Sequence, residues 1–413
     1  MEFRDSKKVI SYFSRIALQL PTIALSTVTM IAISRNLGPS GRGEVSQFLL
    51  LASIVSSIIC TPLFLNIMHL KTASEIKTYV LSNLFLFNRR NLILVGFLDS
   101  CLLFLDLGNR QVLSIENIIY LNLLITFYLI ASQIRDLLIR FHKNKIYGID
   151  FATQMVISGS IFVLLLSNSL LASYVIQIFV VTYGILALLL LVILKSRVKE
   201  FKYVSLVRGG TAPLVHPTPP KAKNSFSKLG ILFQISLSKD LLFGVLILSK
   251  ADFGLMSALA SFWVVIRFLR PSAVIQAKLG TDERLVASGS PRFLTYLSRA
   301  NSAIYVQVAS IALIGLLSYA MTPILMGKGF SPSIGLVIAG TTSEILLMKC
   351  LYDLSTNTSE FSQNLFLYLM MSQVVILVFI GFTGIKLTID LIWISSCVTY
   401  LVWQVINLAR SRK

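Results

Sequence analysis

Ionisable side chains inside apolar stretches are the residues of this sequence best placed to do chemistry. Five of them interrupt runs of Leu, Ile, Val and Phe: Arg15, Lys239, Asp240, Arg267 and Glu344. A charged group at the centre of a bilayer costs about 3 kcal/mol or more unless it meets water or a partner. Each of the five is therefore a candidate for binding a ligand or an ion.

Arg15 begins a polar stripe that continues with Gln19, Thr22, Ser26 and Thr29. The spacings of three and four residues place all five side chains on one face of a helix. A face of this kind is expected to line an aqueous cavity or to pack on another polar helix. The alternative for Arg15 itself is that it reaches the cytoplasmic headgroups.

The other four residues each leave two interpretations open. Lys239 and Asp240 are adjacent, about 100° apart on a helix, so they form either a structural ion pair or an anion-binding Lys239 beside a cation-responsive Asp240. Arg267 either binds a ligand or marks the cytoplasmic side. Glu344 is either a proton or sodium site or the partner of a cation on a neighbouring helix.

The elements that must carry these residues are membrane helices. The chain has 413 residues, of which 55% are hydrophobic and only 13% charged, too few charges for a water-soluble globule. Apolar windows long enough to cross a bilayer predict an all-α integral membrane protein with about 12 transmembrane helices, at residues 12–33, 45–68, 92–108, 113–134, 151–168, 170–194, 229–248, 252–272, 301–321, 333–352, 364–384 and 389–409.

The charge distribution predicts the orientation of these helices. The chain carries 37 Lys and Arg against 18 Asp and Glu, a net charge of +19. Most of the positive residues fall at the termini and in alternate connections, which predicts that both termini are cytoplasmic. This asymmetry accounts for the charge without a nucleic-acid partner.

The sequence contains few features that could form a catalytic or metal centre. Its four cysteines lie in apolar segments without paired spacing, so we expect neither a disulfide nor a metal site. The predicted outer connections are short and no nucleotide-binding loop is present. We therefore expect a protein that is not an enzyme and holds no cofactor, with H⁺ or Na⁺ as candidate coupling ions.

A basic segment rich in Pro and Gly at residues 195–228 predicts a cytoplasmic linker. It separates an N-terminal six-helix bundle, residues 1–194, from a C-terminal six-helix bundle, residues 229–413. Equal halves favour an internal duplication. The echo of Gly43-Glu44-Val45-Ser46 in Gly254-Leu255-Met256-Ser257 supports this interpretation.

Three segments carry a resemblance to a known family. Residues 34–44 read SRNLGPSGRGE, similar to the R-x-LGPxGRGE junction of Wzx-type polysaccharide flippases in the MOP (MATE-like) superfamily. Residues 238–244 with 253–258 resemble the family's pattern at the seventh and eighth spans, with Met256 where the family often has Tyr. Residues 323–330 are similar to its turn after the ninth span.

The resemblance implies a V-shaped pair of six-helix bundles in the bacterial cytoplasmic membrane, working by alternating access. Its substrate would be an undecaprenyl-pyrophosphate-linked oligosaccharide for O-antigen, lipopolysaccharide or capsule synthesis, supplied by glycosyltransferases and consumed by a polymerase. The substrate-binding candidates are Arg15, Gln19, Lys239 and Arg267, and the ion-coupling candidates are Asp240 and Glu344. The alternatives are a MATE-like small-molecule exporter and, less favoured by the short outer connections, a membrane sugar polymerase or glycosyltransferase.

Overall fold

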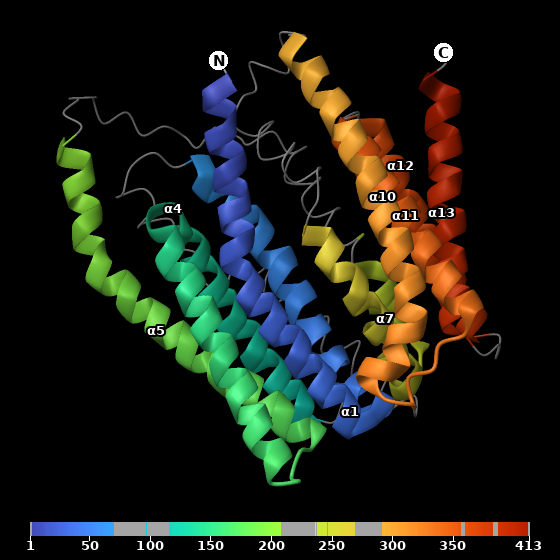
Figure 1. Cartoon of the computed structure of the whole chain (residues 1–413), viewed down its shortest axis with the longest axis horizontal. Helices are drawn as coiled ribbons and strands as arrows, with labels where there is room; N and C mark the ends of the chain where they lie inside the picture. Colours follow the sequence, from blue (N-terminus) through green and yellow to red (C-terminus); the bar gives the residue numbers. More distant parts are fainter. Residues whose placement is uncertain are drawn as a thin grey trace. The chain divides into compact units, whose positions relative to one another are not determined.

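The structure is a computed structural model that describes residues 2–69, 96, 115–207, 236, 238–245, 247–268, 291–356, 360–382 and 387–411. All regular secondary structure in these ranges is helical (Figure 1). The helices with defined bounds are α1 (Glu2–His69), α4 (Ile115–Leu166), α5 (Ala172–Val207), α7 (Lys250–Phe268), α10 (Pro291–Met326), α11 (Ile334–Thr356), α12 (Glu360–Phe382) and α13 (Ile389–Ser411).

Six helical segments in the described part are long and apolar enough to cross a membrane. They are Glu116–Arg135, Ile146–Leu166, Ala172–Leu194, Val308–Met326, Ile334–Leu351 and Ile389–Arg410. The predicted class, a helical membrane protein, is confirmed. The total of 12 spans stays a prediction, and the expected span at 92–108 lies outside the described residues apart from residue 96.

Helix α4 contains two of these spans folded against each other. Arg135 and Asp150 form an ion pair in which Nη2 and Oδ2 are 2.7 Å apart. Residues 15 positions apart on a straight helix would be separated by about 22 Å along its axis. The chain must therefore reverse between the two spans, as the separate windows at 113–134 and 151–168 predict.

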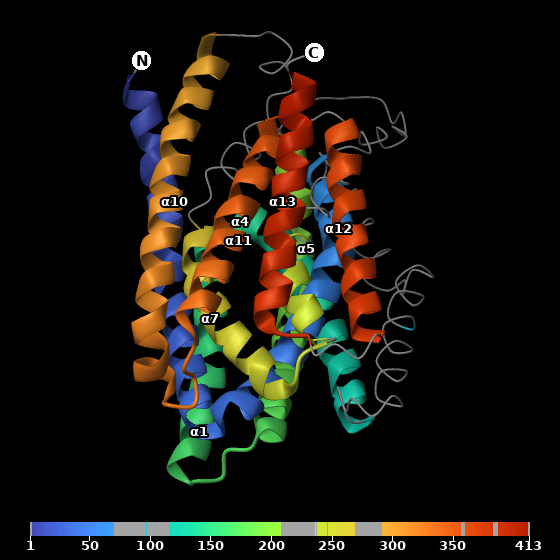
Figure 2. The same cartoon turned by 90° about the vertical axis from the view of Figure 1, so that its right-hand side faces the viewer.

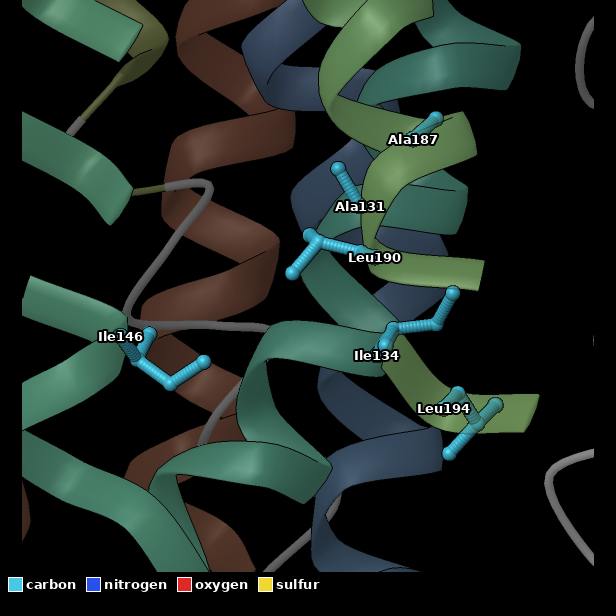
Figure 3. Close-up of a cluster of buried hydrophobic side chains, with 6 residues drawn as sticks. All are labelled: Ala131, Ile134, Ile146, Ala187, Leu190 and Leu194. Carbon is cyan, nitrogen blue, oxygen red and sulfur yellow. The ribbon is translucent and has the colours of Figure 1, made fainter. Parts of the chain in front are cut away.

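The chain divides into two compact units. The first unit contains Met1–Leu37 and Val45–Gln234. In its core, α4 packs on α5 through small and aliphatic side chains (Figure 3), namely Ala131, Ile134, Ile146, Ala187, Leu190 and Leu194. Helix α5 continues through residues 195–207, which were expected to begin the linker; the rest of that linker lies outside the described residues.

The second unit contains Gly38–Glu44 and Ile235–Lys413. Within it, α11 contacts both α10 and α13, and α12 packs on α13 (Figure 2). Trp263 of α7 and Trp393 of α13 meet nearly edge to face, with ring centroids 5.4 Å apart. A Cβ atom at Gly340 of α11 would come within 2.8 Å of both indoles, so these three helices can approach closely only around a glycine.

The segment Gly38–Glu44 makes a reciprocal contact with the start of α7. A Cβ atom on Gly43 would overlap the carbonyl oxygen of Lys250, and a Cβ atom on Gly254 would overlap the carbonyl oxygen of Pro39. Lys250 and Gly254 each follow their counterparts, Pro39 and Gly43, by 211 positions. We call this contact the glycine crossing. The two copies of the sequence echo thus meet at this contact, while the internal duplication stays a prediction.

Arg42 holds the segment Gly38–Glu44 against α7 through hydrogen bonds. Its side chain is fully buried and donates hydrogen bonds to the Ser257 hydroxyl (3.3 Å), the Ser257 carbonyl (3.3 Å) and the Ser261 hydroxyl (2.8 Å). Burial lowers the pKa of Arg42 to about 10, so it remains charged at neutral pH. An ion pair between Glu44 and Lys250, with Nζ and Oε2 3.2 Å apart, lies at the rim of the same contact.

Replacing Gly254 with alanine is expected to destabilise the second unit by about 1–3 kcal/mol, because the added methyl group forces two backbones apart. The matched control is Gly335→Ala on α11, where a Cβ atom meets nothing within 4 Å. Thermal unfolding of the purified protein in detergent measures both variants. Equal melting temperatures for Gly254→Ala and Gly335→Ala would contradict the close approach.

Candidate functional site

The site is built around the buried ammonium group of Lys239. This residue lies in the helical segment 238–245, and only 3% of it is exposed. Its Nζ donates hydrogen bonds to Gln373 Oε1 (2.5 Å) and Ser396 Oγ (3.0 Å) and pairs with Asp240 Oδ1 (3.3 Å). These three oxygens match the three N–H donors of an ammonium group. Lys239 is thus fully hydrogen-bonded inside the protein.

The carboxylate of Asp240 is held by two hydroxyl groups as well as by Lys239. Ser396 donates to its Oδ1 (2.6 Å), and Ser343 donates to its Oδ2 (3.3 Å). Ser343 belongs to α11 and Ser396 to α13. The charged pair therefore ties the segment 238–245 to two neighbouring helices at the depth of their apolar spans.

Gln373 of α12 is oriented by contacts that do not involve Lys239. Its amide nitrogen donates to Ser395 and Ser396, each at 2.8 Å, which turns its carbonyl oxygen toward the ammonium group. The ring of Tyr400 lies 4.5 Å from Nζ, a cation–π contact. We call the set of Asp240, Gln373, Ser396 and Tyr400 the Lys239 cage.

The structure bears on both interpretations of the Lys239–Asp240 pair. The pair is formed, since the long Lys side chain spans the angle between adjacent positions, and both residues also bind other helices. Binding of an anion by Lys239 would require at least one of its three contacts to break. In the structure as described, the Lys239 ammonium group neutralises the Asp240 carboxylate.

The structure describes the remaining predicted site residues only in part. Glu344 follows Ser343 on α11 and is 4% exposed. The backbones of Arg15 and Gln19 lie in α1 and that of Arg267 in the last turn of α7, but their side chains are outside the described part.

The side chains of the polar stripe of α1 are described from Thr22 to Thr29. Thr29 is buried, and its hydroxyl lies 2.7 Å from that of Ser158 in the second span of α4. Gln154, one turn earlier in α4, donates to the same Ser158 hydroxyl (3.3 Å). At this level the stripe packs on another polar helix, which is one of the two outcomes expected for it.

Sequence reasoning missed the neutral members of the cage: Gln373, Ser396 and Tyr400. The available signal was a polar side chain near the middle of an apolar span, since a polar group there needs an interhelical partner. Gln373 meets that criterion within 364–384, and the pair Ser395-Ser396 meets it within 389–409.

The described residues contain no cluster of three or more His, Cys, Asp or Glu side chains that could hold a metal ion. Cys350 and Cys397 are free thiols.

No protein-family model matches the chain, and neither a curated protein nor a solved structure matches it significantly.

Removing the carboxylate of Asp240 is expected to cost about 3–5 kcal/mol of stability, because Asp240→Ala leaves a buried ammonium group without its counter-charge. The double variant Lys239→Met/Asp240→Ala removes both charges and should recover part of this loss. Thermal unfolding of the wild type, both single variants and the double variant completes the cycle. A double variant that loses the full sum of the two single effects would show that the pair is not coupled.

Proposed function

We propose that this protein is a flippase that moves an undecaprenyl-pyrophosphate-linked oligosaccharide across the bacterial cytoplasmic membrane by alternating access. The observation that carries the proposal is the Lys239–Asp240 pair, buried among apolar helices. Ionisable residues at membrane depth are costly and mark substrate or ion pathways in membrane proteins. A passive membrane anchor has no need of them.

The charges within the predicted spans favour an anionic substrate. Arg15, Lys239 and Arg267 are cationic, and groups of this kind replace the hydration of a diphosphate. An exporter of small cations on the same fold would need mainly acidic groups in its cavity. This difference makes the MATE-like exporter the second candidate.

The family resemblance is the reason for proposing a lipid-linked oligosaccharide as the substrate. Two motifs of that resemblance have structural roles in this chain, which supports the resemblance. The motif at residues 34–44 supplies Gly43 and the buried Arg42 of the glycine crossing. The motif at residues 323–330 ends α10 at Gly327, whose φ of 104° favours glycine, and buries Phe330 against Ala258 and Met326. These motif residues therefore help to hold the helix junctions together.

In this proposal the chain has 12 spans in two six-helix bundles, with both termini in the cytoplasm. Arg15, Gln19 and Arg267 bind the diphosphate and sugars, together with Lys239 when its cage opens. Glu344, and Asp240 once Lys239 has left its cage, are the residues that respond to H⁺ or Na⁺. A polymerase and glycosyltransferases are the expected functional partners, and a polymerase or transferase activity of the chain itself is disfavoured.

Arg15→Ala and Lys239→Ala are each expected to reduce surface polysaccharide per molecule of protein at least tenfold, because each removes a cation from the proposed pathway. The assay is complementation of a strain that lacks the chromosomal gene, with polysaccharide quantified on intact cells and protein quantified in membranes.

Lys328→Ala is the matched control, since Lys328 is an exposed cation outside the predicted spans and should tolerate substitution. Wild-type polysaccharide levels with both Arg15→Ala and Lys239→Ala would rule out an anion pathway through these residues. Glycosyltransferase and polymerase genes beside this one in the genome would support the flippase over the exporter.

A further inference from the structure

The Lys239 cage has the composition of a site for a free cation. Hard cations in proteins are bound by carboxylate, amide carbonyl, hydroxyl and water oxygens. Asp240, Gln373 and Ser396 supply the first three types from three separate helical segments, all directed at one point. The Lys239 ammonium group occupies this point, so the cation there is covalently attached to the chain.

Most of the cage holds its shape without help from Lys239. Gln373 is oriented by its own hydrogen bonds to Ser395 and Ser396, and the Asp240 carboxylate accepts hydrogen bonds from Ser343 and Ser396. None of these four hydrogen bonds includes the ammonium group as donor. The oxygens are therefore expected to stay in place when the ammonium group is removed.

We infer that the oxygens of Asp240, Gln373 and Ser396 form a monovalent-cation site in the second unit that Lys239 occupies as a tethered cation. In the natural protein the site is closed to free ions, because Lys239 takes up all three oxygen contacts and is 3% exposed. A neutral residue at position 239 opens the site to Na⁺ or K⁺, which then neutralises Asp240. The inference rests on the geometry of the cage and not on the proposed transport function.

The charge that balances Asp240 in the natural protein comes from the chain itself and not from an ion in solution. A site of this kind filled by a free ion makes stability depend on the salt cation, whereas a tethered ammonium group does not. The natural protein is thus expected to be equally stable in sodium, potassium and choline salts at equal ionic strength. The cation dependence should appear only in variants that lack the ammonium group.

The test is thermal unfolding of the purified full-length protein in detergent, in NaCl, KCl or choline chloride at equal ionic strength. The Lys239→Ala and Lys239→Met variants should melt at least about 2 °C higher in sodium or potassium than in choline, with a saturable dependence on cation concentration. The wild type should show no such difference. Two variants are used because alanine leaves more space for a hydrated ion than methionine does.

Two controls identify the site. Lys239→Ala/Asp240→Asn should lose the cation response, because the carboxylate that holds the ion is gone. Lys250→Ala removes a different lysine from an ion pair, that with Glu44, and should gain no response because that pair is partly exposed.

The inference would be overturned by a folded Lys239→Ala variant that does not respond to cations, or by an equal response in the wild type. Failure of both Lys239 variants to fold in high NaCl would also contradict it, since sodium should restore the missing charge. A cation response in variants that still fail to complement polysaccharide synthesis would leave this inference standing and bear only on the proposed function.

Discussion

The burial of one ammonium group among apolar helices is the constraint on which the second unit depends. Lys239 is tolerable there only because each of its N–H donors meets an oxygen and Asp240 supplies the opposite charge. Those partners lie on different helices, so satisfying one side chain fixes the packing of α12 and α13 against the segment 238–245. Ser343 of α11 joins the same arrangement through Asp240. The need to hydrogen-bond the buried ammonium group thus specifies one packing of these helices, whereas their apolar surfaces alone would allow many.

The glycine crossing is a second constraint of a different physical kind. Gly43 and Gly254 allow two backbones to approach so closely that neither position has room for a Cβ atom. The buried Arg42 adds directional hydrogen bonds to a contact that would otherwise rest on van der Waals packing. The two glycines occupy equivalent positions in the sequence echo, so the crossing brings the two copies of that echo into contact.

The sequence predicts the helical membrane class well, because apolar length is a strong and local signal, and the windows near 113–134, 151–168 and 333–352 recur as helical spans. It also identifies Lys239 and Asp240 as residues of interest. It does not predict their partners, since Gln373 and Ser396 are more than 130 positions away and neutral polar residues in apolar spans look alike. Nor does it predict that Arg42, in the motif at residues 34–44, is fully buried.

The proposed translocation of an anionic lipid-linked oligosaccharide by this chain can be measured in sealed vesicles. The purified protein is reconstituted with an undecaprenyl-pyrophosphate-linked oligosaccharide, and a membrane-impermeant lectin reports the fraction of glycan accessible from outside over time. We expect glycan initially confined to the inner leaflet to reach the lectin much faster in vesicles that contain the protein than in protein-free vesicles. Equal rates in the two preparations, with the reconstituted protein folded, would contradict it.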